Sequence, residues 1–221
     1  MRVLVNGTDS RVGCLVFSRF SKTATTSRGT EAFIEGRAPV KYTPTGVDGV
    51  TIIDIEPLRD DRGFFSQLFN VDEFAEYGLL PNVAQTSLAY NYARGTLRGM
   101  HRQVAPHAEA KLVRCTRGAI VAVALDVRPE SRTYGQHEMI QLSADNRRAL
   151  FLPPYVAHGF QTLADNTEVQ NQVSGLCEPS EEQGFRWDDP AFGIEWPLPV
   201  SVISDQDANW PLLASVRSAA S

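Results

Sequence analysis

Histidine, lysine and aspartate residues mark the part of this sequence that could carry out acid–base chemistry. Only four histidines are present, and two have distinctive surroundings: His101 lies in LRGMHRQ and His158 in PPYVAHGF. Lys111 follows in KLVR, and Asp207 comes late, in ISDQD. A histidine paired with a carboxylate is an oriented general base, and a nearby lysine stabilises a developing oxyanion. A histidine taken singly is more often a structural hydrogen-bonding residue than a catalyst, so the chemistry depends on a fold that brings the four residues together.

A metal site is the competing use of these residues. The common metal-binding pattern of His-x-His followed by Glu would begin at His101, but Gln103 stands at its second position. His107 and Glu109 could supply ligands only with a changed spacing, and Lys111 would place a positive charge beside them. We therefore expect no metal.

Short β-type runs separated by turn residues must position these side chains. The clearest runs are Val50–Ile55, Leu112–Cys115, Ala119–Asp126, Met139–Leu142 and Ala149–Leu152. One brief helix is predicted over Asn70–Tyr77, with a capping residue, an acidic first turn and an end at Gly78. Many short strands at a spacing of roughly 8–12 residues favour an all-β sandwich or barrel, and a double-sheet jelly roll closes its edges well.

The two ends of the chain differ from its middle. Residues 1–45 are predicted to form an irregular extension, residues 46–212 the main domain, and residues 213–221 a loose tail. The opening MRVLVNGTDSRVG resembles the first strand and turn of a dinucleotide-binding fold. Ser10 occupies the place of the usual middle glycine, and irregular sequence follows where the rest of a βαβ unit should be. A short strand or a vestigial sequence is the better interpretation.

Composition excludes several classes of partner. The net charge is −5, from 21 basic and 26 acidic residues, so a general nucleic-acid or anionic-membrane surface is not expected. The three cysteines are far apart and show no CxxC spacing, which predicts reduced thiols in a cytoplasmic protein. No apolar run reaches the roughly 18 residues of a membrane span.

A series of short motifs runs from Gly49 to about Pro211. The motifs are Asp61–Phe65, Leu97–Gln103, Lys111–Cys115, Val123–Arg128, Ser131–Gly135, Leu142–Asn146, Leu152–Phe160, Arg186–Pro190, Ile194–Pro197 and Ile203–Asp207. In this order and near this spacing, they resemble the dTDP-4-dehydrorhamnose 3,5-epimerase family of deoxysugar biosynthesis. A collinear series of this kind is far more specific than any single motif.

This resemblance implies a cupin-type jelly roll (a double-stranded β-helix) with a few short helices, which forms a homodimer. It implies epimerisation of a nucleotide-linked 4-keto-6-deoxysugar, dTDP-linked in the family, without a metal or organic cofactor. His101 is then the base that removes the proton beside the ketone, Asp207 holds the imidazole, and Lys111 supports the enolate oxygen. The implied substrate-binding residues are Arg62, Gln85, Arg98, Gln103 and His158.

The chain departs from the family at the second catalytic group. The family carries a tyrosine thirteen residues beyond the histidine of its AHGF motif, where this chain has Asn171. Asparagine donates a hydrogen bond but is no acid near neutral pH, and a positioned general acid is worth roughly 10²–10⁴-fold in rate. Further departures are Gln67 for a Glu, Ser87 for an Asn, and Leu176-Cys177 for a Tyr-Tyr pair.

These departures leave three interpretations open. The first is an epimerase that acts at one carbon or at both. The second is a keto-sugar isomerase or tautomerase on the same scaffold, which would keep the base and need no acid on the opposite face. The third is a catalytically inactive sugar-nucleotide-binding homologue.

Overall fold

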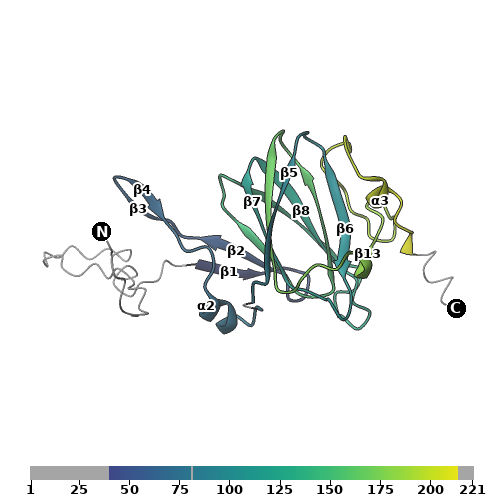
Figure 1. Ribbon diagram of the computed structural model, residues 1–221, viewed down its shortest axis with the longest axis horizontal. Coiled ribbons are helices and arrows are strands. Elements are labelled where there is room, and N and C mark those ends of the chain that lie inside the picture. The colour runs from purple at the N-terminus through teal and green to yellow at the C-terminus, as the bar shows by residue number, and fades with distance from the viewer. Residues whose placement is uncertain (1–39, 81, 214–221) are drawn as a thin grey trace, which may run out of the picture.

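Short strands are the main regular elements of the chain that the structure describes, which is residues 40–80 and 82–213 of this computed structural model (Figure 1). In chain order the elements are β1 (Val40–Pro44), β2 (Thr51–Ile55), β3 (Leu58–Asp60), β4 (Gly63–Phe65), α2 (Val71–Glu76), β5 (Gln85–Asn91), β6 (Leu97–Gln103), β7 (Lys111–Arg117), β8 (Ala119–Asp126), β9 (His137–Ser143), β10 (Ala149–Leu152), β11 (Val156–Thr162), β12 (Thr167–Val173), η1 (Pro179–Glu181), β13 (Glu182–Gly184) and α3 (Asp205–Ala208).

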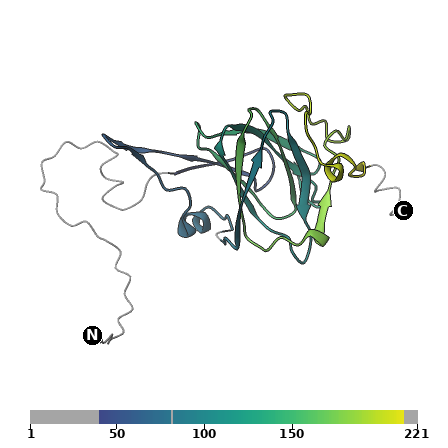
Figure 2. The ribbon, with the colours of Figure 1, turned by 45° about the horizontal axis from the view of Figure 1, so that its top comes forward.

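Two stacked sheets make up the body of the molecule (Figures 1 and 2). The six-stranded sheet has the order β1-β2-β10-β7-β12-β5, and the five-stranded sheet has the order β13-β6-β11-β8-β9. Most neighbouring strands are distant in sequence and all these pairs are antiparallel, which is the jelly-roll arrangement. The predicted all-β jelly roll is therefore confirmed. A separate hairpin of β3 and β4 projects from this body (Figure 2).

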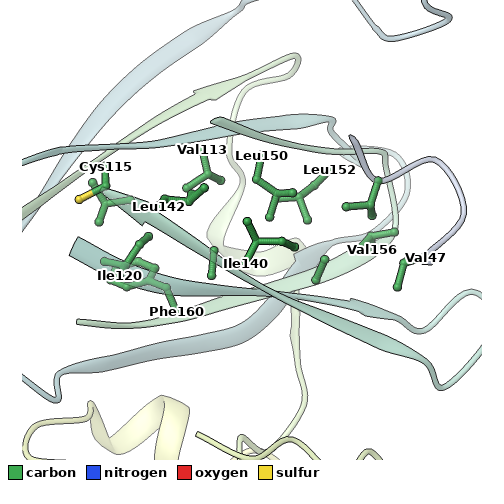
Figure 3. Packing of buried hydrophobic residues seen from close by; sticks show 14 residues of the cluster. Val47, Val113, Cys115, Ile120, Ile140, Leu142, Leu150, Leu152, Val156 and Phe160 are labelled. Atoms are coloured by element: carbon green, nitrogen blue, oxygen red, sulfur yellow. The ribbon is translucent and has the colours of Figure 1, made fainter. Parts of the chain in front are cut away.

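Aliphatic side chains fill one side of the space between the sheets (Figure 3). The cluster includes Val113, Cys115, Leu150, Leu152 and Val169 from the six-stranded sheet, and Ile120, Ile140, Leu142, Val156 and Phe160 from the five-stranded sheet. Each large aliphatic side chain buried in this way stabilises the fold by about 1.5–3 kcal/mol. This core fixes the distance and the register of the two layers, so the polar remainder of the same space has rigid walls.

The outer faces of the sheets are covered as well. On β8, Ile120 points into the core between the sheets, whereas Val123 packs with Phe185 and Phe192 of the C-terminal segment on the outside. Burial on both faces explains why this strand reads as an unbroken apolar run. On the six-stranded sheet, Phe74 of α2 packs in an outer cluster.

The predicted elements agree with the structure except near the N-terminus. The side chain of Asn70 accepts hydrogen bonds from two backbone N–H groups of α2, so the predicted helix is confirmed with Asn70 as its cap. Val40–Pro44, placed by the sequence in the irregular extension, instead pairs with β2 as β1. The dinucleotide-like opening lies outside the described residues. In the described part of the chain, no helix is long and apolar enough to cross a membrane.

Candidate active site between the two sheets

Polar side chains line the space between the sheets on the side away from the aliphatic core. His101 on β6 pairs in register with His158 on β11, so both imidazoles come from the five-stranded sheet. Lys111 opens β7 in the facing sheet and lines one pocket together with His158 and Gln103. The fold therefore brings together three of the residues that the sequence singled out, from strands distant in the chain.

The electrostatics of this group keep both histidines neutral. Burial lowers the pKa of His101 to about 3, and the positive charges of Lys111 and Arg98 add to the effect. Burial likewise lowers the pKa of His158 well below its ordinary value, with Lys111 and His101 contributing. His158 is only 3% exposed, and its Nε2 has no hydrogen-bond partner among the described residues. A neutral imidazole at His101 has a lone pair available to accept a proton.

Asp207 lies near this group but is not bonded to it. Its helix α3 contacts β6, and Trp210 just beyond that helix covers Gly184, the residue paired with His101. The Asp207 carboxylate accepts a hydrogen bond of 3.4 Å from Trp210 Nε1. Within the described residues, no hydrogen bond joins Asp207 to His101. The fold thus places Asp207 and His101 on elements that contact each other, but the predicted hydrogen bond between the two side chains is not formed.

Two other predicted substrate-binding residues flank His101 on β6. Arg98 is exposed, and its Nε donates to Asn91 Oδ1 at 2.8 Å, which ties the guanidinium to the end of β5. Gln103 is buried and is held by the 177–178 segment: its Oε1 accepts from the Glu178 backbone N–H at 3.3 Å. Arg98 therefore leaves donors free for a ligand, while Gln103 shapes the pocket wall.

Asn171 sits on the wall that faces the two histidines. It lies on β12, two residues from the core residue Val169, so alternation turns it toward the space between the sheets. Its cross-strand partners are Val113 on β7 and Ser87 on β5. Ser87 and Asn171, two of the positions where the sequence predicted departures from the family pattern, are therefore direct neighbours. Gln85, also predicted to bind substrate, is exposed at the start of β5 on the same face.

Arg62 lies apart from the other predicted site residues. It occupies the turn of the projecting β3–β4 hairpin, its side chain is 90% exposed, and its ion pair is with Asp60 of the same turn. Figure 1 shows this hairpin well removed from β6. Arg62 does not reach the His101 pocket of its own chain.

Glu109 is a pocket residue that the sequence indicated only as a weak metal ligand. Its side chain is 5% exposed and lies 3.7 Å from Lys111 Nζ. Burial raises the pKa of its carboxyl, and Lys111 opposes that effect. Among residues 40–80 and 82–213, no group of three or more His, Cys, Asp or Glu side chains is placed to hold a metal ion. The only signal available in the sequence was a carboxylate two residues before Lys111.

Comparison with known proteins decides the family. The family model described as dTDP-4-dehydrorhamnose 3,5-epimerase matches residues 44–215. The chain belongs to this family. It is 40% identical over 176 residues to a dTDP-4-dehydrorhamnose 3,5-epimerase of Methanothermobacter thermautotrophicus, covering 78% of this chain and 94% of the relative. The resemblance read from the motifs is confirmed, and with it the assignment to the carbohydrate epimerases, which are isomerases.

Two further relatives show the range of this epimerase family. A dTDP-4-dehydrorhamnose 3-epimerase of Streptomyces niveus is 36% identical over 181 residues, or 81% of this chain and 87% of the relative. A crystal structure of the Bacillus anthracis dTDP-4-dehydrorhamnose 3,5-epimerase with TDP and PPi bound superposes with a TM-score of 0.76 at 34% identity. That match covers 79% of this chain and all (100%) of the other.

Proposed function

We propose that the protein epimerises a dTDP-linked 4-keto-6-deoxysugar at one or both of the carbons next to the ketone. The observation that carries this proposal is the placement of neutral His101 opposite the Lys111 ammonium between two rigid sheets. A proton next to a ketone leaves only if the enolate oxygen is stabilised, and this pair supplies a base and a cation. The substrate's own carbonyl accepts the electrons, so the chemistry needs neither a metal nor an organic cofactor.

His101 is the proposed base. Its low pKa keeps it unprotonated, and a bound anionic substrate would favour the imidazolium that forms when it takes the proton. Asp207 is the proposed partner of that imidazolium. Turning toward His101 would cost Asp207 only its long 3.4 Å contact with Trp210, and an ion pair in a half-buried pocket offsets that loss. His158 lies beside His101 with a free Nε2 and would hydrogen-bond the sugar.

The nucleotide end of the substrate is proposed to lie along β5. Arg98 presents a guanidinium there, and its fork geometry suits a pyrophosphate oxygen pair. Gln85 at the start of β5 offers a neutral hydrogen-bonding group. The dTDP assignment rests on the relatives, whose names and bound TDP concern dTDP-sugars.

A homodimer is proposed to complete the site. The β3–β4 hairpin carries Phe65, 62% exposed, over a cavity of about 360 Å³ that is lined mainly by apolar groups. A projecting apolar arm of this kind is typical of a protein–protein contact. Because Arg62 at its tip does not reach the pocket of its own chain, its proposed role in binding substrate requires the pocket of a partner subunit.

We also place the protein in the cytoplasm, since the two described cysteines, Cys115 and Cys177, are free thiols.

Incubation with dTDP-4-keto-6-deoxyglucose in D2O tests the function. The proposal expects deuterium at C3, at C5 or at both, with inverted product detected by NMR. Exchange without inversion would instead favour the isomerase or tautomerase interpretation, which the neutral Asn171 also allows. No exchange with any nucleotide-linked 4-keto-6-deoxysugar would refute an enzymatic role and leave a sugar-nucleotide-binding protein.

A further inference from the structure

The wall opposite His101 has no acid at the position where the family carries its tyrosine. Three strands make this wall, and the residues that alternation turns inward are Lys111, Val113 and Cys115 on β7, Val169, Asn171 and Val173 on β12, and Gln85, Ser87, Ala89 and Asn91 on β5. Among them only Lys111 and Cys115 titrate. Cys115 is 2% exposed within the aliphatic core, and burial raises its pKa to about 11. Lys111 is the one inward group of these strands that can give up a proton to a ligand.

The surroundings of Lys111 suit that task. Its side chain is 15% exposed, and Glu109 lies 3.7 Å from Nζ with the other carboxylate oxygen, Oε2, buried and unpartnered among the described residues. His101 and His158 interact electrostatically with Lys111 from the facing sheet. Glu182 and Cys177 also lie close enough to Lys111 for an electrostatic interaction. Glu109 is the partner close enough for an ion pair, and that contact fixes the direction in which the Lys111 side chain points.

We propose that Lys111, aimed by Glu109, delivers the proton to the face of the enolate that His101 does not serve. This inference rests on the proposed function. In the first step the C–H bond beside the ketone breaks, its proton goes to the His101 imidazole, and the electron pair forms the enolate. In the second step a Lys111 N–H bond breaks and a new C–H bond forms on the opposite face. His101 is then protonated and Lys111 neutral, and exchange with water restores both.

The Lys111 ammonium can both hydrogen-bond the enolate and donate a proton to it. An ammonium carries three donors, so one N–H can bond the enolate oxygen while another points at the carbon. Glu109 acts through Lys111 and is therefore a positioning residue, whereas Lys111 is a catalytic residue. Asn171 then contributes only a neutral hydrogen bond, which explains how an epimerase can carry it.

Lys111→Arg separates the two roles of the lysine, because arginine keeps the positive charge but does not release a proton near neutral pH. We expect hydrogen–deuterium exchange at the sugar carbon to persist within about tenfold, while inversion falls by about 100-fold or more. Glu109→Gln should lower the ratio of inversion to exchange with little change in KM, and Glu109→Asp should restore part of it. The matched control is Glu73→Gln, which removes another buried carboxylate, one on helix α2 that accepts a hydrogen bond from Tyr42.

A second readout needs no substrate. The chain has three lysines, Lys22, Lys41 and Lys111, so acylation of each amine can be followed by peptide mass spectrometry. Only neutral amines react, and loss of the Glu109 charge should speed labelling of Lys111 relative to Lys41 by about tenfold or more. Unchanged labelling would contradict the positioning role of Glu109.

If the wild type exchanges and Lys111→Arg inverts as fast as the wild type, the donor role of Lys111 is wrong while the proposed function stands. A wild type without exchange would overturn both.

Discussion

The acid limb of the pH–rate profile follows from the surroundings of His101. Burial is the largest cause of its lowered pKa, followed by the charges of Lys111 and Arg98, and together they bring it to about 3. The base must be neutral to take a proton, so kcat/KM for exchange should fall only as the pH drops through the free-enzyme pKa of His101. A histidine of ordinary pKa, about 6.5, would be roughly 3% neutral at pH 5, a loss of about 30-fold relative to pH 7.5. His101 as placed here should lose less than about twofold.

The assay is initial-rate deuterium incorporation into the 4-keto sugar at constant ionic strength, read by mass spectrometry from pH 5 to 7.5. Lys111→Met provides the internal check, because removing one of the two cations should raise the pKa of His101 and move the acid limb upward. A wild-type limb centred near pH 6.5, unmoved in Lys111→Met, would refute the assignment of His101 as a base shaped by burial and by these cations. Protein stability must be followed in the same buffers.

Three further predictions concern neighbouring features. His158 has a lowered pKa in the folded protein, so below about pH 6.5 the unfolded state binds more protons than the folded state. The free energy of unfolding should therefore fall from pH 7 to pH 5. Urea titrations of His158→Gln should show a smaller dependence of this free energy on pH. A slope unchanged by the substitution would contradict the burial of a neutral imidazole. Asn171→Tyr should raise inversion per exchange event by restoring an acid to this wall, and an unchanged ratio would mean that position 171 does not face the reacting carbon. Mixing inactive Arg62→Ala and His101→Ala proteins should recover activity through heterodimers with one intact site; no recovery after subunit exchange would show that Arg62 does not act across an interface.

Much of this fold is readable from the sequence because each strand has its own local signal. The run Ala119–Leu125 is apolar and makes up all but the last residue of β8, an interior strand that is covered on both faces. Asn70 and the acidic residues after it mark the helix α2, which needs only its own cap to be recognised. By contrast, Val40–Pro44 is only five residues long and follows irregular sequence, so its alternation is too short to predict a strand, and its conformation depends on pairing with β2.

In the candidate site, too, the placement of some residues could be predicted from the sequence and that of others could not. Residues within one motif, such as Arg98 and His101, keep their relation in the fold because a single strand carries them. Asp207 comes from a separate segment, and its hydrogen bond to Trp210 could not be foreseen from residue types. Glu109 shows the converse: only its burial beside Lys111 and its unpartnered oxygen give it a role, and neither property is visible in the letters of the sequence.

Proton removal by His101 is the central step of the proposed reaction. Its most direct test is the rate of deuterium uptake at C3 and C5 of dTDP-4-keto-6-deoxyglucose by wild-type protein and by His101→Asn, with binding of the nucleotide sugar measured in parallel by calorimetry. We predict that His101→Asn retains binding and loses exchange by about 100-fold or more, the range of a positioned general base. Exchange at the wild-type rate in His101→Asn, with binding intact, would contradict the account.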